Sequence, residues 1–261
     1  QGYGSDFYQV DEVKDLDWDA YRAVVCYRCS REDVVCKVVE QAKKTGLNVY
    51  YDIDDLIFDY ERISYLHFLT GSEYKDFKKT TEQIHSCMEL CDGYFTSTDT
   101  LAGEIRREFP GKPVVINRNC ASMEMQILSH DAVEQVEKDP EHIFIGYFSG
   151  SKTHDQDFEV VEEALLEVMK EHPEVRLKLV GVLSDRKMEK FGNKVEKLPF
   201  MDWRQLPGVI AGLDINLMPL ENTLFHCCKS ENKWTEAALV KVPSVMSRNR
   251  EMEYVIENGK D

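Results

Sequence analysis

The chain has 261 residues, of which 43% are hydrophobic, and it carries a formal net charge of −16. This length suits two ordinary globular domains, and the acidic balance argues against a nucleic-acid binder, which needs a basic face. No stretch approaches the ~18 apolar residues of a membrane span, and no signal pattern precedes the first domain. We therefore expect a cytoplasmic protein without a transmembrane segment, for which peripheral contact with a membrane stays open.

The first 120 residues alternate between strand-like and helix-like patterns. Strands are predicted over residues 21–27, 47–52, 93–97 and 113–117. Helices are predicted over residues 31–44, with Ser30 as the cap, and 98–109, with two more between residues 56 and 91. Because strands and helices alternate throughout, the pattern predicts a doubly wound α/β domain at residues 1–120.

A charged helix over residues 123–138 is expected to connect this domain to a second one at residues 121–261. There, strands are predicted over residues 143–148, 176–181, 195–198, 213–218 and 243–247. Helices are predicted over residues 155–171, 185–191, 203–211, 230–240 and from residue 251 onward. The first half lacks a leading strand and the second stops early, so we expect two Rossmann-like domains facing a cleft, each incomplete at its terminus.

The segment from Leu213 to Ser247 reads as strand, loop, helix and strand. Parallel sheets bind ligands at the carboxyl ends of their strands, beside helix N-termini. Lys229, Lys233 and Glu236 are spaced i, i+4 and i+7 along the predicted helix, so we expect them to share one face. Two cations and a carboxylate there suit a sugar linked to a nucleotide through phosphates. The alternative is an ordinary solvated helix face.

A short loop, Ser149-Gly150-Ser151-Lys152-Thr153, joins a predicted strand to a predicted helix. Its glycine permits close backbone approach, and Ser151 and Lys152 offer donors to an anion. The spacing fits neither a dinucleotide fingerprint nor a P-loop, so an ordinary turn remains an alternative. Because this loop and Lys229 follow strands of the same predicted sheet, we expect them to converge.

The acidic segment Asp52-Ile53-Asp54-Asp55 follows another predicted strand. It is compatible with a DxD metal site, or with the DxDx[TV] signature of haloacid-dehalogenase-type phosphatases, with Asp52 as nucleophile and Asp54 as acid/base. Leu56 stands where that signature has Thr or Val. The remaining reading is that Asp52, Asp54 and Asp55 cap a helix beginning near Leu56 and line a cleft.

The cysteines and histidines indicate no metal site or disulfide framework. The CxxC at residues 26–29 has no second pair in sequence, and the cysteines at residues 87 and 91 lie in a helical run. His154 and His226 fall in loops near the candidate anion site. Either could reach a substrate, although an isolated loop histidine is more often simply solvated.

Together, four segments resemble retaining GT-B glycosyltransferases (group 1, family 4-like) that build surface polysaccharides and O-antigens. The segments are YDIDDLIFD (51–59), CDGYFTSTDTLAGEI (91–105), IGYFSGSKTHDQDF (145–158) and DINLMPLENTLFHCCKSENKWTEAALVKVPSV (214–245). The resemblance implies that the first domain binds the acceptor and the second the nucleotide sugar. It implies transfer of a hexose from a nucleotide-diphosphate sugar to a glycan or lipid-linked acceptor with retention of configuration.

The resemblance also implies residue roles. Glu236 matches the glutamate that binds the donor ribose, and Lys152 and Lys229 match the cations on the pyrophosphate. Ser149, Gly150 and Ser151 would add backbone donors. The family has a further glutamate at the position of Cys228. Glu231 is the nearest carboxylate in sequence that could replace that glutamate.

Under this reading neither a metal nor a cofactor is expected, and Asp52, Asp54 and Asp55 would line the acceptor side. The alternatives are a metal-dependent phosphatase that uses Asp52 and Asp54, and a non-catalytic module that binds nucleotides or glycans.

Overall fold

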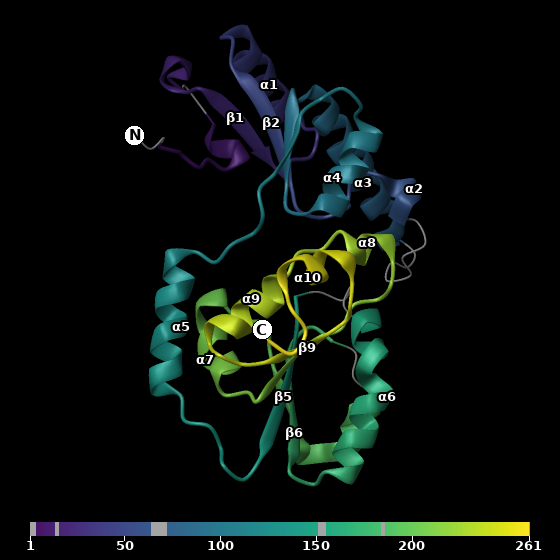
Figure 1. Ribbon diagram of the computed structural model, residues 1–261. Coiled ribbons are helices and arrows are strands. Elements are labelled where there is room, and N and C mark those ends of the chain that lie inside the picture. Colours follow the sequence, from purple (N-terminus) through teal and green to yellow (C-terminus); the bar gives the residue numbers. More distant parts are fainter. Residues whose placement is uncertain (1–3, 14–15, 64–71, 151–154, 184–185, 261) are drawn as a thin grey trace. The chain divides into compact units, whose positions relative to one another are not determined.

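A computed structural model describes residues 4–13, 16–63, 72–150, 155–183 and 186–260 (Figure 1). The chain divides into two compact units, Gln1–Arg118 and Asn119–Asp261. Each unit has its own sheet, in the orders β1-β2-β3-β4 and β7-β6-β5-β8-β9, and every strand pairing is parallel. The predicted α/β class is therefore confirmed.

The first unit follows the predicted alternation closely. Its strands are β1 (Ala23–Tyr27), β2 (Asn48–Ile53), β3 (Gly93–Thr96) and β4 (Val114–Ile116). Its α-helices are α1 (Asp33–Lys44), α2 (Tyr60–Ile63), α3 (Ser72–Leu90) and α4 (Asp99–Glu108), preceded by the 3₁₀ turns Val10–Glu12 and Trp18–Ala20.

Two helix starts in this unit differ from the prediction. Helix α1 begins after Glu32, so Ser30 is not its cap. No helix begins at Leu56 either, because the chain turns after β2 and buries the side chains of Leu56 and Phe58 before α2 starts at Tyr60. The prediction that the acids at 52–55 cap a helix is therefore wrong. Thr98 does cap α4, accepting a hydrogen bond from the backbone N–H of Leu101.

The fold of the first unit brings the CxxC cysteines of residues 26–29 close to the cysteines at residues 87 and 91. The thiol of Cys26, on β1, contacts those of Cys29 and Cys91, and Cys87 lies close enough for its charge state to respond to them. Burial raises the pKa of the Cys87 thiol to about 12. All eight cysteines are among the described residues, and none forms a disulfide. This cluster is therefore a packed group of free thiols close to Tyr51.

The second unit has five strands, β5 (Ile143–Ser149), β6 (Val175–Gly181), β7 (Val195–Leu198), β8 (Ile215–Met218) and β9 (Ser244–Met246). Its α-helices are α5 (Met123–Gln135), α6 (Asp155–Glu171), α7 (Leu206–Ala211), α8 (Leu224–Cys227), α9 (Asn232–Leu239) and α10 (Arg250–Val255). The segments Arg186–Lys194 and Trp203–Gln205 are 3₁₀ helices. Two details differ from the prediction, since the loop after β8 contains α8, and the helix expected from residue 230 begins at Asn232.

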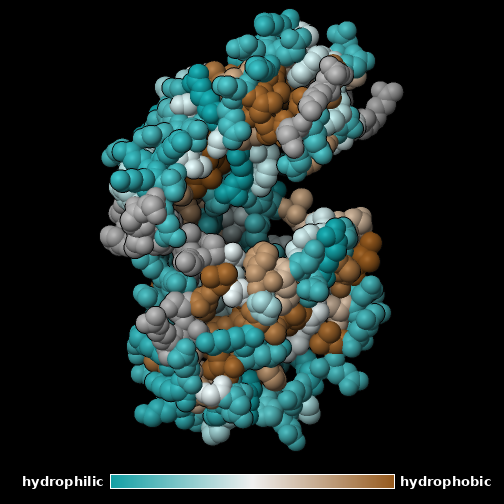
Figure 2. Space-filling model, turned by 180° about the vertical axis from the view of Figure 1, so that it is seen from behind, coloured by the Kyte–Doolittle hydropathy of each residue, from teal (hydrophilic) through white to brown (hydrophobic). Residues whose placement is uncertain are grey.

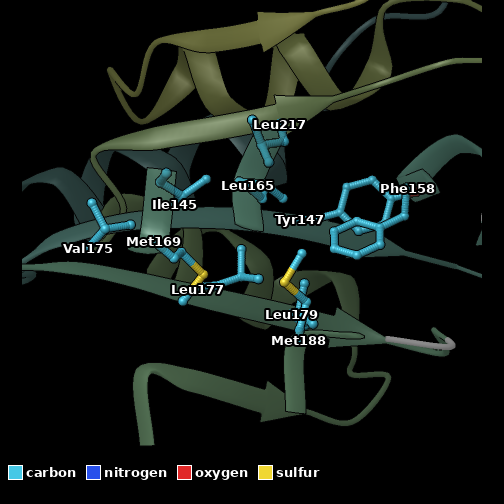
Figure 3. Packing of buried hydrophobic residues seen from close by; sticks show 10 residues of the cluster. All are labelled: Ile145, Tyr147, Phe158, Leu165, Met169, Val175, Leu177, Leu179, Met188 and Leu217. Carbon is cyan, nitrogen blue, oxygen red and sulfur yellow. The ribbon is translucent and has the colours of Figure 1, made fainter. Parts of the chain in front are cut away.

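The sheet of the second unit is packed on both faces. On one face, Ile145 and Tyr147 of β5 contact Phe158 of α6, and Figure 3 shows the rings of Tyr147 and Phe158 lying against each other, with centroids 5.1 Å apart. On the other, Phe144 and Phe148 of β5 contact a cluster contributed by α5, α7 and α9. Adjacent strand residues point to opposite faces, which explains this division.

Helix α5 belongs to the second unit and is not a connector. The side chain of Ala132 is buried in the same cluster as Ile210 of α7 and Ala237 of α9. Ser129 of α5 is also buried. The weak apolar stripe misled the prediction, because small residues such as Ala and Ser allow close helix packing without a strong hydrophobic signal.

Among the helices of the described residues, none combines the length and apolar content needed to cross a bilayer. Hydrophilic residues cover most of the face shown in Figure 2.

Candidate functional site

The chain order of the second sheet defines where a ligand fits. From β5 the chain proceeds outward through β6 and β7, and it then crosses back to β8 and β9 on the other side of β5. Parallel sheets bind ligands at such a reversal point, outside the carboxyl ends of the two central strands. The chain leaves these ends after Ser149 of β5 and after Met218 of β8, and the second of them leads through residues 219–231, which include α8, to α9.

The loop after β5 is only partly described. Ser151, Lys152, Thr153 and His154 lie outside the described residues, so the expected convergence of Lys152 with Lys229 stays a prediction. Gly150 is described and exposed, and a side chain built on it would meet open space.

Ser149 fixes the edge of the site. Its buried hydroxyl donates a hydrogen bond to the carbonyl oxygen of Val182, 2.6 Å away, so it ties the end of β5 to the end of β6. Gly181 permits this approach: it has φ +96°, and a Cβ there would lie 1.9 Å from the carbonyl oxygen of Ser149.

The loop after β8 is anchored to α6 through a buried carboxylate. The Oδ1 atom of Asp157 accepts a hydrogen bond from the backbone N–H of Glu221 at 3.0 Å and lies 3.1 Å from Nε2 of His226. The other ring nitrogen of His226 is 2.6 Å from the hydroxyl oxygen of Thr223, whose side chain caps α8. His226 is therefore neither solvated nor aimed at a substrate; it holds the loop.

Asp157, Glu221 and His226 are also the group of potential metal ligands that lies closest together among the described residues. The carboxylate oxygen and both ring nitrogens already have protein partners, and the neighbouring ammonium of Lys233 would repel a cation. We therefore assign these residues a hydrogen-bonded anchoring role.

Lys229 follows α8 and precedes α9, so it does not share a continuous helix with Lys233 and Glu236 as the spacing had suggested. Its ammonium nitrogen lies 4.6 Å from the centre of the Phe225 ring, a cation–π distance. The charges of Lys229 and Lys233 still act on each other, which shows that the fold brings the two ammoniums to one place.

The residue roles implied by the resemblance leave out Lys233, although it lies on the predicted charged helix face. Its ammonium nitrogen is buried without a hydrogen-bond partner among the described residues and lies 5.0 Å from the centre of the Tyr147 ring. Burial lowers the pKa of Lys233 to about 8, an effect that the charges of Asp157 and Glu236 oppose and that of Lys229 reinforces. The spacing of Lys233 and Glu236 on one helix was visible in the sequence, but the burial was not.

Two glutamates complete the group. Glu231, only 7% exposed, stands at the N-terminus of α9, and its Oε2 atom is buried without a hydrogen-bond partner among the described residues. Burial raises the pKa of Glu236, and the charge of Lys233 opposes the rise. Cys228, at the position where the resemblance implies a further glutamate, is 0% exposed. Buried polar atoms rarely lack partners, and when they do a ligand commonly supplies them.

Two acids of the first unit pair with a cation that the sequence did not indicate, whereas the placement of these acids on the acceptor side stays a prediction. The guanidinium of Arg28 lies 2.7 Å from Asp55 and 3.5 Å from Asp54. Burial, and then the charge of Asp54, raise the pKa of Asp52. A metal site or a metal-dependent phosphatase needs a metal cation bound between these carboxylates. Arg28 already supplies a positive charge there, so neither alternative is favoured.

A pocket of about 310 Å³ lies elsewhere in the first unit, over α2 and α3. Its walls include Phe58, Tyr60, Lys78, Thr81 and His85. The hydroxyl oxygens of Tyr60 and Thr81 are buried and without a hydrogen-bond partner among the described residues. The ammonium of Lys78 lies 5.0 Å from the centre of the Tyr60 ring.

Several solved structures of similar fold are glycosyltransferases. WaaG, described as a glycosyltransferase involved in lipopolysaccharide biosynthesis, is 15% identical at a TM-score of 0.55, and the match covers 85% of this chain and 65% of WaaG. S. aureus TarM, solved with UDP, is 13% identical at a TM-score of 0.54, over 82% of this chain and 40% of TarM. The pneumococcal O-GlcNAc transferase GtfA, solved with UDP and GlcNAc, is 13% identical at a TM-score of 0.54, over 88% and 43%.

These matches show that the chain has the GT-B fold, with Rossmann-like α/β units. The chain spans less than two thirds of the length of each of these structures. No family model matches the sequence, and no curated protein sequence matches it.

Proposed function

We propose that the protein acts as a retaining glycosyltransferase that moves a hexose-type sugar from a nucleotide-diphosphate sugar to a hydroxyl group of a glycan or a lipid-linked acceptor. One observation supports the proposal: at the reversal point of the second sheet, Glu231 and Lys233 bury polar atoms for which the described residues offer no hydrogen-bond partner. The fold shared with glycosyltransferases that bind UDP supports the choice of ligand. This activity fits the cytoplasm, where nucleotide sugars are made. Its role would be in polysaccharide biosynthesis.

Each residue of the group has a chemical role in this proposal. The ammonium of Lys229, together with Lys152, neutralises the departing diphosphate, assisted by the N-terminal dipole of α9. The carboxylate of Glu236 accepts hydrogen bonds from the ribose hydroxyls, and that of Glu231 from the sugar hydroxyls. The backbone of Ser149, Gly150 and Ser151 adds donors to the phosphates. In this arrangement the lysine cations neutralise the diphosphate charge, which other transferases neutralise with a divalent metal.

The chain's contribution to the chemical step is orientation and charge stabilisation. A front-face displacement, in which a donor phosphate oxygen receives the proton of the acceptor hydroxyl, retains configuration and needs no protein base. Holding donor and acceptor in a reactive geometry and stabilising the negative charge that develops on the leaving diphosphate then supply the rate enhancement.

We propose that the acceptor binds to the first unit. The pocket over α2 and α3 offers two partnerless hydroxyls and an aromatic ring, groups that suit a sugar with its hydroxyl-rich edge and apolar face. Asp52, Asp54 and Asp55 are the other acceptor candidates, although Arg28 already pairs with two of them.

A thermal-shift screen against a panel of nucleotide sugars, followed by calorimetry, tests the proposal. The Lys229→Ala and Glu236→Ala variants should each lose tenfold or more in nucleotide affinity, since each removes a charged contact of roughly 1.5–3 kcal/mol. Lys170→Ala, at the exposed C-terminal end of α6, is the matched control and should bind normally. Unchanged affinity in both site variants would refute the site.

The same preparations separate the alternatives. Tight donor binding without sugar transfer by a full-length protein would favour a non-catalytic module. Magnesium-dependent release of phosphate from a model ester, abolished by Asp52→Asn, would favour the phosphatase.

A further inference from the structure

Lys233 is held in surroundings that oppose its charged form. Its ammonium nitrogen is buried without a hydrogen-bond partner in the part of the chain that the structure describes, and the aromatic ring that it contacts, that of Tyr147, is itself fully buried. An ammonium group has three N–H donors and loses several kcal/mol of hydration on burial. A cation–π contact of roughly 1–2 kcal/mol offsets only part of that loss.

The neighbouring charged groups do not complete the compensation. Asp157 faces Lys233 from α6, but its Oδ1 atom is engaged with the backbone of Glu221 and with His226. Glu236, on the same helix, is itself buried enough that its pKa is raised. Lys229 adds a second positive charge from the preceding loop, and Glu231 buries a carboxylate oxygen that has no hydrogen-bond partner among the residues described.

Two ammoniums that repel each other, at the carboxyl ends of the central strands, form a site that a multiply charged anion would stabilise. A single carboxylate would neutralise one of them, whereas a diphosphate carries at least two charges and several acceptor oxygens. The anion would also supply the hydrogen-bond acceptors that Lys233 lacks.

We infer that Lys233 is a further diphosphate-binding residue of this site, and that its ammonium forms fully only when the diphosphate arrives, so that donor binding takes up a proton from solution. This inference rests on the proposed donor site and adds to it a linkage between proton and donor. In the empty site near pH 8 a substantial fraction of Lys233 is the neutral amine, consistent with the lowering of its pKa.

Calorimetry with the whole chain and UDP, GDP or ADP, whichever binds most tightly, tests the linkage. At pH 8.5, in buffers of different ionisation enthalpy, the unmodified protein should take up about 0.8 proton per nucleotide, the neutral fraction of a lysine with a pKa of about 8. Its affinity should fall up to about tenfold per pH unit above pH 8.

Two variants isolate Lys233. Lys233→Arg keeps the charge at every pH, so it should bind the nucleotide without the extra proton uptake and with a flatter pH profile. Any proton that the nucleotide itself takes up or releases is the same in this variant, so the difference between the two proteins reports Lys233 alone. Lys233→Met removes the charge, and it should bind at least tenfold more weakly without that uptake. A residue with only a structural role would leave proton uptake unchanged in both variants.

The outcomes separate this inference from the proposed function. Nucleotide binding by the unmodified protein with no proton uptake, or with the same uptake in Lys233→Met, overturns the inference and leaves the function standing. A side-chain NMR titration that places the pKa of Lys233 in the empty protein above 10 overturns it as well. Failure of every nucleotide to bind between pH 6 and pH 9 overturns both.

Discussion

The Nε2 atom of His226 lies 3.1 Å from the Oδ1 atom of Asp157, and these side chains are 2% and 0% exposed. One residue is on α8 and the other in the first turn of α6, 69 positions apart in sequence. The same carboxylate oxygen accepts the backbone N–H of Glu221. This contact therefore determines where the loop carrying Lys229 and Glu231 lies.

We expect Asp157→Ala to destabilise the protein by about 2–3 kcal/mol, because it leaves a buried imidazole and a buried backbone N–H without a partner. It should also weaken nucleotide binding by displacing the loop after β8. Urea denaturation and calorimetry measure the two effects. His142→Ala is the matched control, since it breaks a more exposed His–Asp pair with Asp139 and should cost less than about 1 kcal/mol. Equal losses in the two variants would contradict the anchoring role.

Gly181→Ala should destabilise the second unit. A Cβ there would lie 1.9 Å from the carbonyl oxygen of Ser149, and the backbone has φ +96°. Strain of this kind costs roughly 1–3 kcal/mol for the dihedral angle alone, before the displacement of β5 is counted. Gly208→Ala, in α7 with open space around it, should instead leave stability unchanged or raise it by up to about 1 kcal/mol. Denaturant unfolding of both variants checks this contrast.

Glu231→Gln and Glu236→Gln should separate the two ends of the donor. If Glu231 binds the sugar, its variant should bind the nucleotide sugar about tenfold or more weakly while binding the free nucleoside diphosphate normally. If Glu236 binds the ribose, its variant should lose affinity for both ligands. Calorimetry with each ligand reads the pattern directly. If Glu231→Gln binds the nucleotide sugar normally, the buried carboxylate of Glu231 does not recognise the sugar.

Lys233 should destabilise the empty protein at neutral pH. Its pKa in the folded chain is about 8, against a usual value of 10.5, so between these values the unfolded chain binds more protons than the folded one. The free energy of unfolding contributed by this group must then rise as pH increases from 8 to 10.5, by on the order of 3 kcal/mol. Lys233→Met should be more stable than the unmodified protein at pH 7 and lose the advantage near pH 10. Thermal unfolding across this range, without nucleotide, measures the difference.

Asp52→Asn should stabilise the first unit at neutral pH. Burial and the charge of Asp54 raise the pKa of Asp52, so the folded chain binds a proton more readily than the unfolded chain does. Stability contributed by Asp52 therefore falls as pH rises through its pKa, and an uncharged amide avoids that loss. The gain should vanish at pH 3, where the carboxyl is protonated in both states. A loss of stability at pH 7 would show instead that Asp52 has a compensating partner when ionised.

The sequence by itself determined the alternation of strands and helices, because hydrophobic periodicity is local and each buried strand marks itself with apolar residues. Strand β7 was predicted to the residue, at Val195–Leu198. The strand, helix and strand order around Glu236 was equally readable and is found as β8, α9 and β9, whereas the role of Glu236 in ligand binding stays a prediction. Periodicity failed where small residues carry the packing, as at Ala132 of α5, and where a polar loop hides a short helix, as at His226 of α8.

Only the tertiary structure decided which polar side chains lack partners. Lys229, Lys233 and Glu236 looked alike as members of a charged helix face. The fold buries Lys233 against Tyr147 of β5 and beside Asp157 of α6, residues more than 70 positions away. It also brings Arg28 onto Asp54 and Asp55, which removes the basis for a metal site. Desolvation and charge pairing depend on contacts between distant segments, so no local pattern in the chain could report them.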